Sequence, residues 1–148
     1  ENLKTTRYND GTLIPHVTYS KQWPKLKNGA YCLYENNEAY KEKYGALYNW
    51  YAVNTGNLAP KGWHVPTDAE WTELEKYYMN NYSSFSALPG GFRDFSGSFS
   101  NQGYRGYWWC ATEHDATYAW FRILYYYERL SRGSSSKGCG FSVRLVKD

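Results

Sequence analysis

The stretch Val65-Pro66-Thr67-Asp68-Ala69-Glu70-Trp71 decides the fold, because it marks where the clearest helix of the chain begins. Thr67 and Glu70 have the spacing of a capping box, in which two side chains satisfy the free backbone N–H groups of the first turn. Asp68 places a negative charge at the positive end of the helix dipole. We therefore predict a helix over residues 68–78. Its buried face is predicted to carry Trp71, Leu74 and Tyr78.

The segments before this helix are predicted to form loops and short strands. The turn signals Asn9-Asp10-Gly11 and Ile14-Pro15 favour a short strand or a loop layer over a sheet edge for residues 1–29. Residues 30–34 are a short β-prone run. For residues 46–53, periodicity leaves three possibilities open: a strand, a helix, or a strand that leads into a short helix.

The segments after the helix predict a sheet. Three runs have strand character: residues 107–112, 119–127 and 140–146. Residues 95–106 and the polar stretch 128–139 are predicted to be loops. There is no internal repeat and no linker between domains. The sequence therefore predicts a single domain over residues 1–148.

Charge and hydropathy argue against two kinds of partner. The net charge is only +3, and Lys and Arg are scattered, so we predict no nucleic-acid partner. No apolar run is long enough to cross a bilayer, so we predict no membrane insertion by this domain, and Glu1-Asn2-Leu3-Lys4 lacks signal-peptide character. Three cysteines, Cys32, Cys110 and Cys139, leave open one disulfide plus a free thiol, or three thiols.

Patterns for catalysis and metal binding are weak. His16, His64 and His114 lack zinc-ligand spacing, and no EF-hand-like ladder occurs, so we predict neither a metal nor a cofactor. Glu113-His114-Asp115 is the most tempting acid–base cluster, but adjacent residues on a strand or turn point in different directions. We therefore predict that the chain is not an enzyme.

The aromatic content is high, with 17 Tyr and 7 Trp, and suits either an irregular core or a contact surface. In residues 119–127 the side chains alternate between two faces. If Trp120 and Leu124 anchor the core, the opposite row projects outward near the loops. That row consists of Phe121, Ile123, Tyr125 and Tyr127. The alternative is that these aromatic side chains fill a second layer of core under the long loops.

Several blocks, in this order and spacing, together resemble a known family. They include Tyr44-Gly45-Ala46-Leu47-Tyr48-Asn49-Trp50, Leu88-Pro89-Gly90-Gly91-Phe92-Arg93 and residues 1–11, 62–71, 106–109 and 140–144. The family is the Fibrobacter succinogenes major paralogous domain, and the resemblance covers nearly the whole chain. It implies an α+β domain of the formylglycine-generating-enzyme branch of the C-type-lectin fold, with a small twisted antiparallel sheet, two short helices and extensive ordered loops. It also implies an extracellular or cell-surface location, with lipid anchoring through another segment, or a phage particle.

The sequence departs from the family pattern in two places. An insertion that usually follows the helix is missing at residues 79–84, so that side of the domain is trimmed. In the C-terminal part, Trp108, Trp109, Thr112, Glu113, Trp120, Arg122, Leu124 and the block 140–144 hold the pattern. The departures there are Tyr104, Arg105, Cys110, His114, Asp115, Tyr118, Ile123, Tyr127, Gly133, Ser134, Ser135 and Cys139. This distribution resembles the variable proteins of diversity-generating retroelements, which display altered residues on this fold.

The resemblance does not extend to known chemistry of the fold. The redox-active cysteine pair of the formylglycine-generating relatives and the calcium-dependent sugar-binding signatures of lectins are both absent. We therefore expect a ligand-binding domain whose partner is a protein or a glycan. Its candidate residues are Tyr104, Arg105, Cys110, His114, Asp115, Tyr118, Phe121, Ile123, Tyr127, Arg129, Arg132 and Ser134. The alternatives are a structural module of a bacterial surface assembly and, third, a cryptic enzyme.

Overall fold

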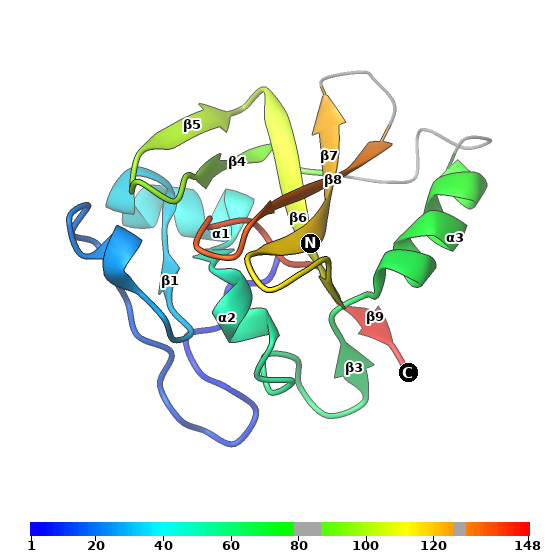
Figure 1. Ribbon diagram of the computed structural model, residues 1–148, viewed down its shortest axis with the longest axis horizontal. Helices are drawn as coiled ribbons and strands as arrows, with labels where there is room; N and C mark the ends of the chain where they lie inside the picture. Colours follow the sequence, from blue (N-terminus) through cyan, green and yellow to red (C-terminus); the bar gives the residue numbers. More distant parts are fainter. Residues whose placement is uncertain (79–86, 126–129) are drawn as a thin grey trace.

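The computed structural model describes residues 1–78, 87–125 and 130–148, and its centre is a curled five-stranded sheet (Figure 1). The strand order is β5-β4-β6-β7-β8. The strands are β4 (Gly90–Arg93), β5 (Phe99–Gln102), β6 (Arg105–Glu113), β7 (Tyr118–Tyr125) and β8 (Leu130–Ser136). Neighbours run antiparallel except β4 and β6, which meet in parallel where Gly91 pairs with Gly106. The sheet is therefore mixed, and not purely antiparallel as expected.

Short helices and two small sheets surround this sheet and complete an α+β architecture. The α-helices are α1 (Lys41–Tyr44), α2 (Trp50–Val53) and α3 (Asp68–Tyr78), and the 3-10 helices are η1 (Trp23–Lys25), η2 (Tyr34–Asn36) and η3 (Glu38–Tyr40). β1 (Tyr31–Cys32) pairs with β2 (Leu47–Tyr48), and β3 (Trp63–His64) pairs with β9 (Val146–Lys147). The expected α+β class is confirmed, with more helical segments than the two expected.

α3 begins and ends as the sequence predicts. The Thr67 N–H donates to Glu70 Oε2 at 2.8 Å, and the Glu70 N–H donates back to Thr67 Oγ1 at 3.2 Å, which is a complete capping box. Trp71 is buried, and Leu74 packs beside it. The side chain of Tyr78 and the shortened connection at residues 79–84 lie outside the described part of the chain.

The structure resolves one open prediction and corrects three others. Residues 46–53 form a strand that leads into a short helix, which was one of the three possibilities. The predicted loops 128–139 and 95–106 contain β8 and β5, because pairing with β7 and β4 turns polar segments into strands. The predicted strand 140–146 is not continuous. Its first residues make single bridges to three different partners, Arg93, Tyr48 and Trp108.

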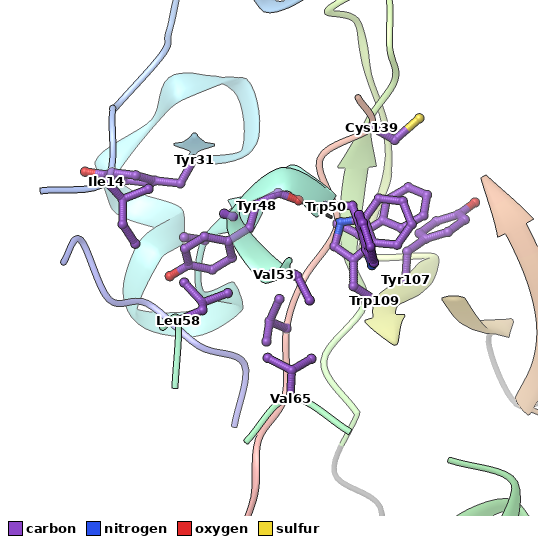
Figure 2. Packing of buried hydrophobic residues seen from close by; sticks show 14 of the residues in the cluster. Ile14, Tyr31, Tyr48, Trp50, Val53, Leu58, Val65, Tyr107, Trp109 and Cys139 are labelled. Atoms are coloured by element: carbon purple, nitrogen blue, oxygen red, sulfur yellow. Dashed lines mark hydrogen bonds between the residues drawn. The ribbon is translucent and has the colours of Figure 1, made fainter. Parts of the chain in front are cut away.

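The largest apolar cluster joins β6 and β7 to the loop-rich first half of the chain (Figure 2). Buried indoles in it donate to backbone carbonyls across the core. Trp109 Nε1 donates to the Tyr48 carbonyl at 2.8 Å, and Trp50 Nε1 donates to the Cys110 carbonyl at 2.9 Å. Much of the tryptophan content is therefore framework that fixes both halves of the chain together.

The first residues of the chain are held by its last third. The Leu3 N–H donates to the Val143 carbonyl at 2.8 Å. Asn2 is buried, and its Oδ1 accepts from Trp108 Nε1 at 2.9 Å while its amide donates to the Tyr44 carbonyl. The N-terminal segment is thus part of the core structure and not a peripheral layer.

All three cysteines are buried free thiols, which settles the question of pairing in favour of three thiols. Burial raises the pKa of Cys32 and that of Cys110 to about 12. Burial also raises the pKa of Cys139. In the described ranges, no helix is both long enough and apolar enough to span a membrane.

Candidate binding surface

The pleat of β7 sends its side chains to two different environments. Trp120 and Leu124 lie on the side of the sheet covered by α3, where they pack with Trp71, Trp108 and Cys110. Ala119, Phe121 and Ile123 lie on the other side, against the largest apolar cluster. The predicted alternation is therefore present, but both of its rows meet a core.

Phe121 and Ile123 are consequently not the free outward row that the alternation predicted. The Phe121 ring lies 4.9 Å from the Phe141 ring and 6.1 Å from the Tyr107 ring, between centroids. Both Phe121 and Ile123 are half-buried against the core. For these two side chains the alternative of a second core layer describes the structure better, because both pack against the largest apolar cluster.

Cys110 is also unable to contact a ligand, because its side chain has no access to the surface. It is fully buried beneath α3, and its Sγ accepts a hydrogen bond from Arg122 Nη1 at 3.5 Å. Tyr127 and Arg129 fall in residues 126–129, outside the described part of the chain. The remaining candidates separate into two groups at opposite ends of β6.

The smaller group lies at the start of β6. Tyr104 is 72% exposed, and the Arg105 guanidinium lies over the Tyr125 ring, 4.5 Å from its centroid. Arg105 and Tyr125 are also direct partners in the β6–β7 ladder. This group is small, and Arg105 is already engaged by a neighbour.

The larger group forms a continuous patch at the other end of β6, which we call the β7–β8 surface. Its members are His114, Asp115, Tyr118, Trp120, Arg132 and Ser134. The His114 ring meets the Trp120 ring edge-on, with centroids 4.5 Å apart. Trp120 faces Ser134 across the β7–β8 ladder. Tyr118 is 44% exposed, so this patch combines an open aromatic side chain with a half-buried one.

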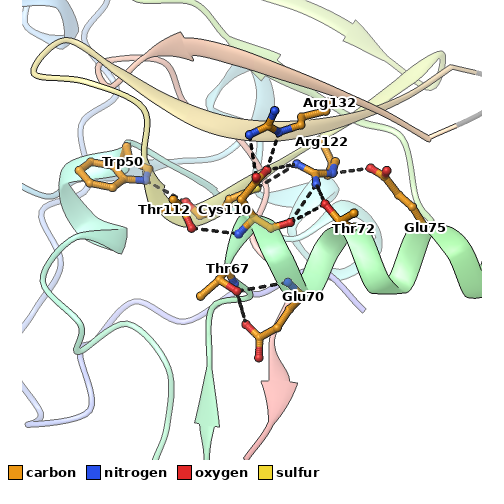
Figure 3. A network of polar contacts seen from close by, with 10 residues as sticks. Trp50, Thr67, Glu70, Thr72, Glu75, Cys110, Thr112, Arg122 and Arg132 are labelled. Carbon is orange, nitrogen blue, oxygen red and sulfur yellow. Dashed lines mark hydrogen bonds and ion pairs between the residues drawn. The ribbon is translucent and has the colours of Figure 1, made fainter.

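Arg132 is held rigidly at the border of this surface (Figure 3). Its Nε and Nη2 donate to the two carboxylate oxygens of Asp68 at 2.8 and 2.7 Å. Its guanidinium carbon also lies 3.5 Å from the centroid of the Trp120 ring. A bidentate ion pair and a cation–π contact together fix the plane of the guanidinium, so little side-chain entropy is left to lose on binding.

The same carboxylate extends the network into the interior. Asp68 Oδ1 also accepts from Arg122 Nη1 at 2.7 Å, and Arg122 is fully buried. Arg122 Nη2 donates to Thr72 Oγ1 at 3.0 Å, and its Nε pairs with Glu75. Burial raises the pKa of Asp68, but the hydrogen bonds from Arg132 and Arg122 outweigh it, so the pKa is lowered and the carboxylate stays charged.

The turn between β6 and β7 is fixed by Asp115. Its Oδ1 accepts from the backbone N–H groups of Thr117 at 2.7 Å and Tyr118 at 2.9 Å, and these bonds lower the pKa of Asp115. Its Oδ2 meets His114 Nδ1 at 2.7 Å. The turn is therefore a rigid support for the exposed rings on either side of it.

The three residues Glu113-His114-Asp115 do not converge on one point. Glu113 pairs with Lys137, whose ammonium also donates to the Ala116 carbonyl at 2.8 Å and lies 5.0 Å from the centre of the Trp50 ring. Asp115 is occupied by the turn. In residues 1–78, 87–125 and 130–148, no cluster of three or more His, Cys, Asp or Glu side chains could hold a metal ion.

Two residues, Trp120 in the β7–β8 surface and Asp68 at its border, could not be assigned to this site by sequence reasoning alone. Trp120 holds the family pattern and was assigned to the framework, yet it forms the centre of the exposed patch. Asp68 was assigned to the helix start, yet it holds Arg132, which lies 64 residues away in the sequence. Only the pairing of β7 with β8 under α3 brings these residues together.

The fold and this surface define a class of α+β domain in which a curled mixed sheet, covered on one side by a helix, carries exposed polar and aromatic residues on its last two strands. The family model described as the Fibrobacter succinogenes major domain matches residues 1–82 and 78–147, so the chain belongs to that family. The matched segments meet at residues 78–82, beside the predicted shortened connection. No curated protein and no solved structure matches the chain.

Proposed function

We propose that this domain is a non-enzymatic ligand-binding module with a C-type-lectin-like fold, and that the β7–β8 surface contacts the ligand. The observation that carries the proposal is the anchoring of Arg132 by Asp68 and Trp120 beside the open ring of Tyr118. Tyr, Trp and Arg dominate binding energy in protein interfaces, and side chains that are already fixed lose little entropy when a partner binds.

We further propose that this surface is diversified by a retroelement. The different burial of positions that hold the family pattern and positions that depart from it supports diversification. Trp108, Trp109 and Arg122 hold the family pattern and are fully buried, whereas departures such as His114 and Tyr118 are exposed. Exposed positions on a rigid support tolerate substitution, because most surface changes alter stability by less than about 0.5 kcal/mol. Cys110 and Cys139 are exceptions, because both depart from the pattern and are buried.

The genomic locus tests diversification directly. We expect a near-identical template repeat beside a reverse-transcriptase gene, with mismatches confined to adenines of the template. A locus without both features would contradict diversification and leave an ordinary paralogous module.

The family resemblance supports an extracellular or cell-surface location, with a lipid anchor on another segment, or a place on a phage particle. The partner at such a location is a protein or a glycan, and neither nucleic acid nor bilayer insertion is part of the proposal. The competing function is structural: the same side chains would pack against neighbouring modules of a surface assembly.

The binding proposal is tested by screening the domain on arrays of glycans and bacterial surface proteins. We expect Tyr118→Ala to abolish capture while the melting temperature stays nearly unchanged. Tyr19→Ala is the matched control, because Tyr19 is also exposed, at 61%, and lies outside the β7–β8 surface. Equal capture by both variants would place the ligand elsewhere. A fall in stability of several kcal/mol for Tyr118→Ala would show that its side chain is part of the core.

A further inference from the structure

A pocket of about 380 Å³ opens between the N-terminal loop and α2, apart from the β7–β8 surface. Its wall residues include Tyr8 from the loop, Asn28 before β1, Tyr51 in α2 and Asn54 directly after it. None of its lining residues belongs to β6, β7 or β8. The volume falls near the lower end of the range for small-molecule sites, roughly 300–1,000 Å³.

Among the polar side chains that line this pocket, Thr55 is engaged, because its hydroxyl donates to the Ala52 carbonyl at 2.8 Å, and the others are unused. The side-chain amides of Asn28 and Asn54, the hydroxyls of Tyr8 and Tyr51 and the ammonium of Lys27 make no hydrogen bond to the residues that the structure describes. Burial and the charge of Asp10 raise the pKa of Tyr8, so its hydroxyl keeps its proton. The pocket therefore presents several donors and acceptors that only water or a ligand can satisfy.

At Gly29, which lines the pocket, the backbone packs directly against Tyr8 and Ala52. A Cβ atom added at Gly29 would lie 2.1 Å from Tyr8 Oη and 2.9 Å from Ala52 Cα, so no side chain fits there. Tyr8 lies across this glycine, and Tyr51 follows the buried start of α2. Both tyrosines are half-buried, which gives the pocket fixed aromatic walls.

We propose that this pocket binds a single sugar ring, and that an acidic substituent on the ring pairs with Lys27. Amides and phenols both donate and accept hydrogen bonds, as sugar hydroxyls do. Half-buried tyrosines offer apolar surface for the C–H face of the ring. No carboxylate is among the lining residues, so an amine or a metal ion would find no counter-charge, whereas an acid finds Lys27.

This inference does not rest on the function proposed for the β7–β8 surface, because the two sites share no residue. Titration of the ¹⁵N-labelled domain with glucose and with glucuronate tests it. We expect saturable amide shifts at residues 8, 28, 51 and 54, with a millimolar dissociation constant typical of a small polar ligand. Glucuronate should bind roughly twofold to fivefold more tightly than glucose, the factor that an exposed ion pair supplies.

Paired variants separate the pocket from the rest of the surface. Asn54→Ala and Tyr51→Phe should each weaken binding several-fold, and Lys27→Gln should remove the preference for glucuronate. Asn57→Ala and Tyr19→Phe are the controls, since neither residue lines the pocket. Saturable shifts confined to β7 and β8, equal effects of Asn54→Ala and Asn57→Ala, or no saturable shift with either sugar would each overturn the proposal.

Discussion

The guanidinium of Arg132 packs against the ring of Trp120, at 3.5 Å from the ring centroid, while its Nε and Nη2 donate to the two carboxylate oxygens of Asp68. This relationship links α3, β7 and β8 at the border of the candidate surface. Although the guanidinium is fixed, 46% of the Arg132 side chain is open to solvent. A fixed cation is useful for recognition and modest in its effect on stability.

Replacing Arg132 with Lys should therefore affect binding more than folding. Lysine keeps the charge but cannot make the bidentate bond to Asp68 or the planar contact with Trp120. We expect a loss of about 1 kcal/mol in the free energy of unfolding, measured by urea denaturation. Capture of the ligand should fall much further than this loss explains. Equal binding by both proteins would show that Arg132 is only a support for α3.

Replacing Arg122 should affect folding more than binding. Arg122 is fully buried, and Arg122→Met would leave Asp68 and Glu75 without their interior partner. Removing one side of a buried ion pair costs about 3–5 kcal/mol, so the variant should unfold at a much lower urea concentration. The matched control is Arg7→Met, since the Arg7 side chain is exposed and donates to the Gly11 carbonyl. Similar midpoints for both variants would contradict the role assigned to the network.

The positions of Arg132 and Arg122 also show which parts of the structure can be predicted from the sequence. The start of α3 was predictable because a capping box is local, with both partners inside one helical turn. β8 was not, because its run of Ser and Gly has low strand propensity and becomes a strand only through its pairing with β7. The same pairing places Arg132 opposite Arg122, so the candidate site depends on contacts that no local pattern encodes.

Substitution of Gly133 should destabilise the fold, although this position departs from the family pattern. A Cβ atom added there would lie 2.9 Å from two carbons of the Phe121 ring. Gly133→Ala must displace that ring from the core and should cost about 1–3 kcal/mol by thermal or urea denaturation. Ser134→Ala, one residue away and exposed, should change stability by less than about 0.5 kcal/mol. If Gly133→Ala is as stable as Ser134→Ala, this position is free to vary.

His64 should make stability depend on pH. Hydrogen bonds that the protonated His64 ring donates to Asp148 at 2.6 Å and to Glu70 at 2.8 Å raise the pKa of His64 above its ordinary value of 6.5. A raised pKa in the folded state stabilises the protein fully below 6.5, and this contribution is lost as the pH rises through the raised value. The free energy of unfolding of the natural chain should thus fall relative to His64→Gln over that window. Parallel curves would mean that the contacts are too exposed to matter.

The three thiols should react only slowly in the native domain. Because burial raises the pKa of Cys32 and Cys110 to about 12, almost no thiolate forms at pH 8. An aromatic disulfide reagent should label the native protein slowly and should titrate all three thiols in denaturant. Rapid labelling of a native thiol would contradict the burial, and fewer than three thiols in non-reducing denaturant would reveal a disulfide.

The bond from the Leu3 N–H to the Val143 carbonyl has a consequence for synthesis of the chain. A nascent chain emerges from its N-terminus, so residues 2 and 3 leave the ribosome long before Trp108 and Val143 exist to receive them. The first half of the domain therefore remains incompletely folded during synthesis, and its core tryptophan side chains stay exposed. Closure comes as a late event that joins both ends at once, and we expect folding to be slow because contacts between distant residues dominate it.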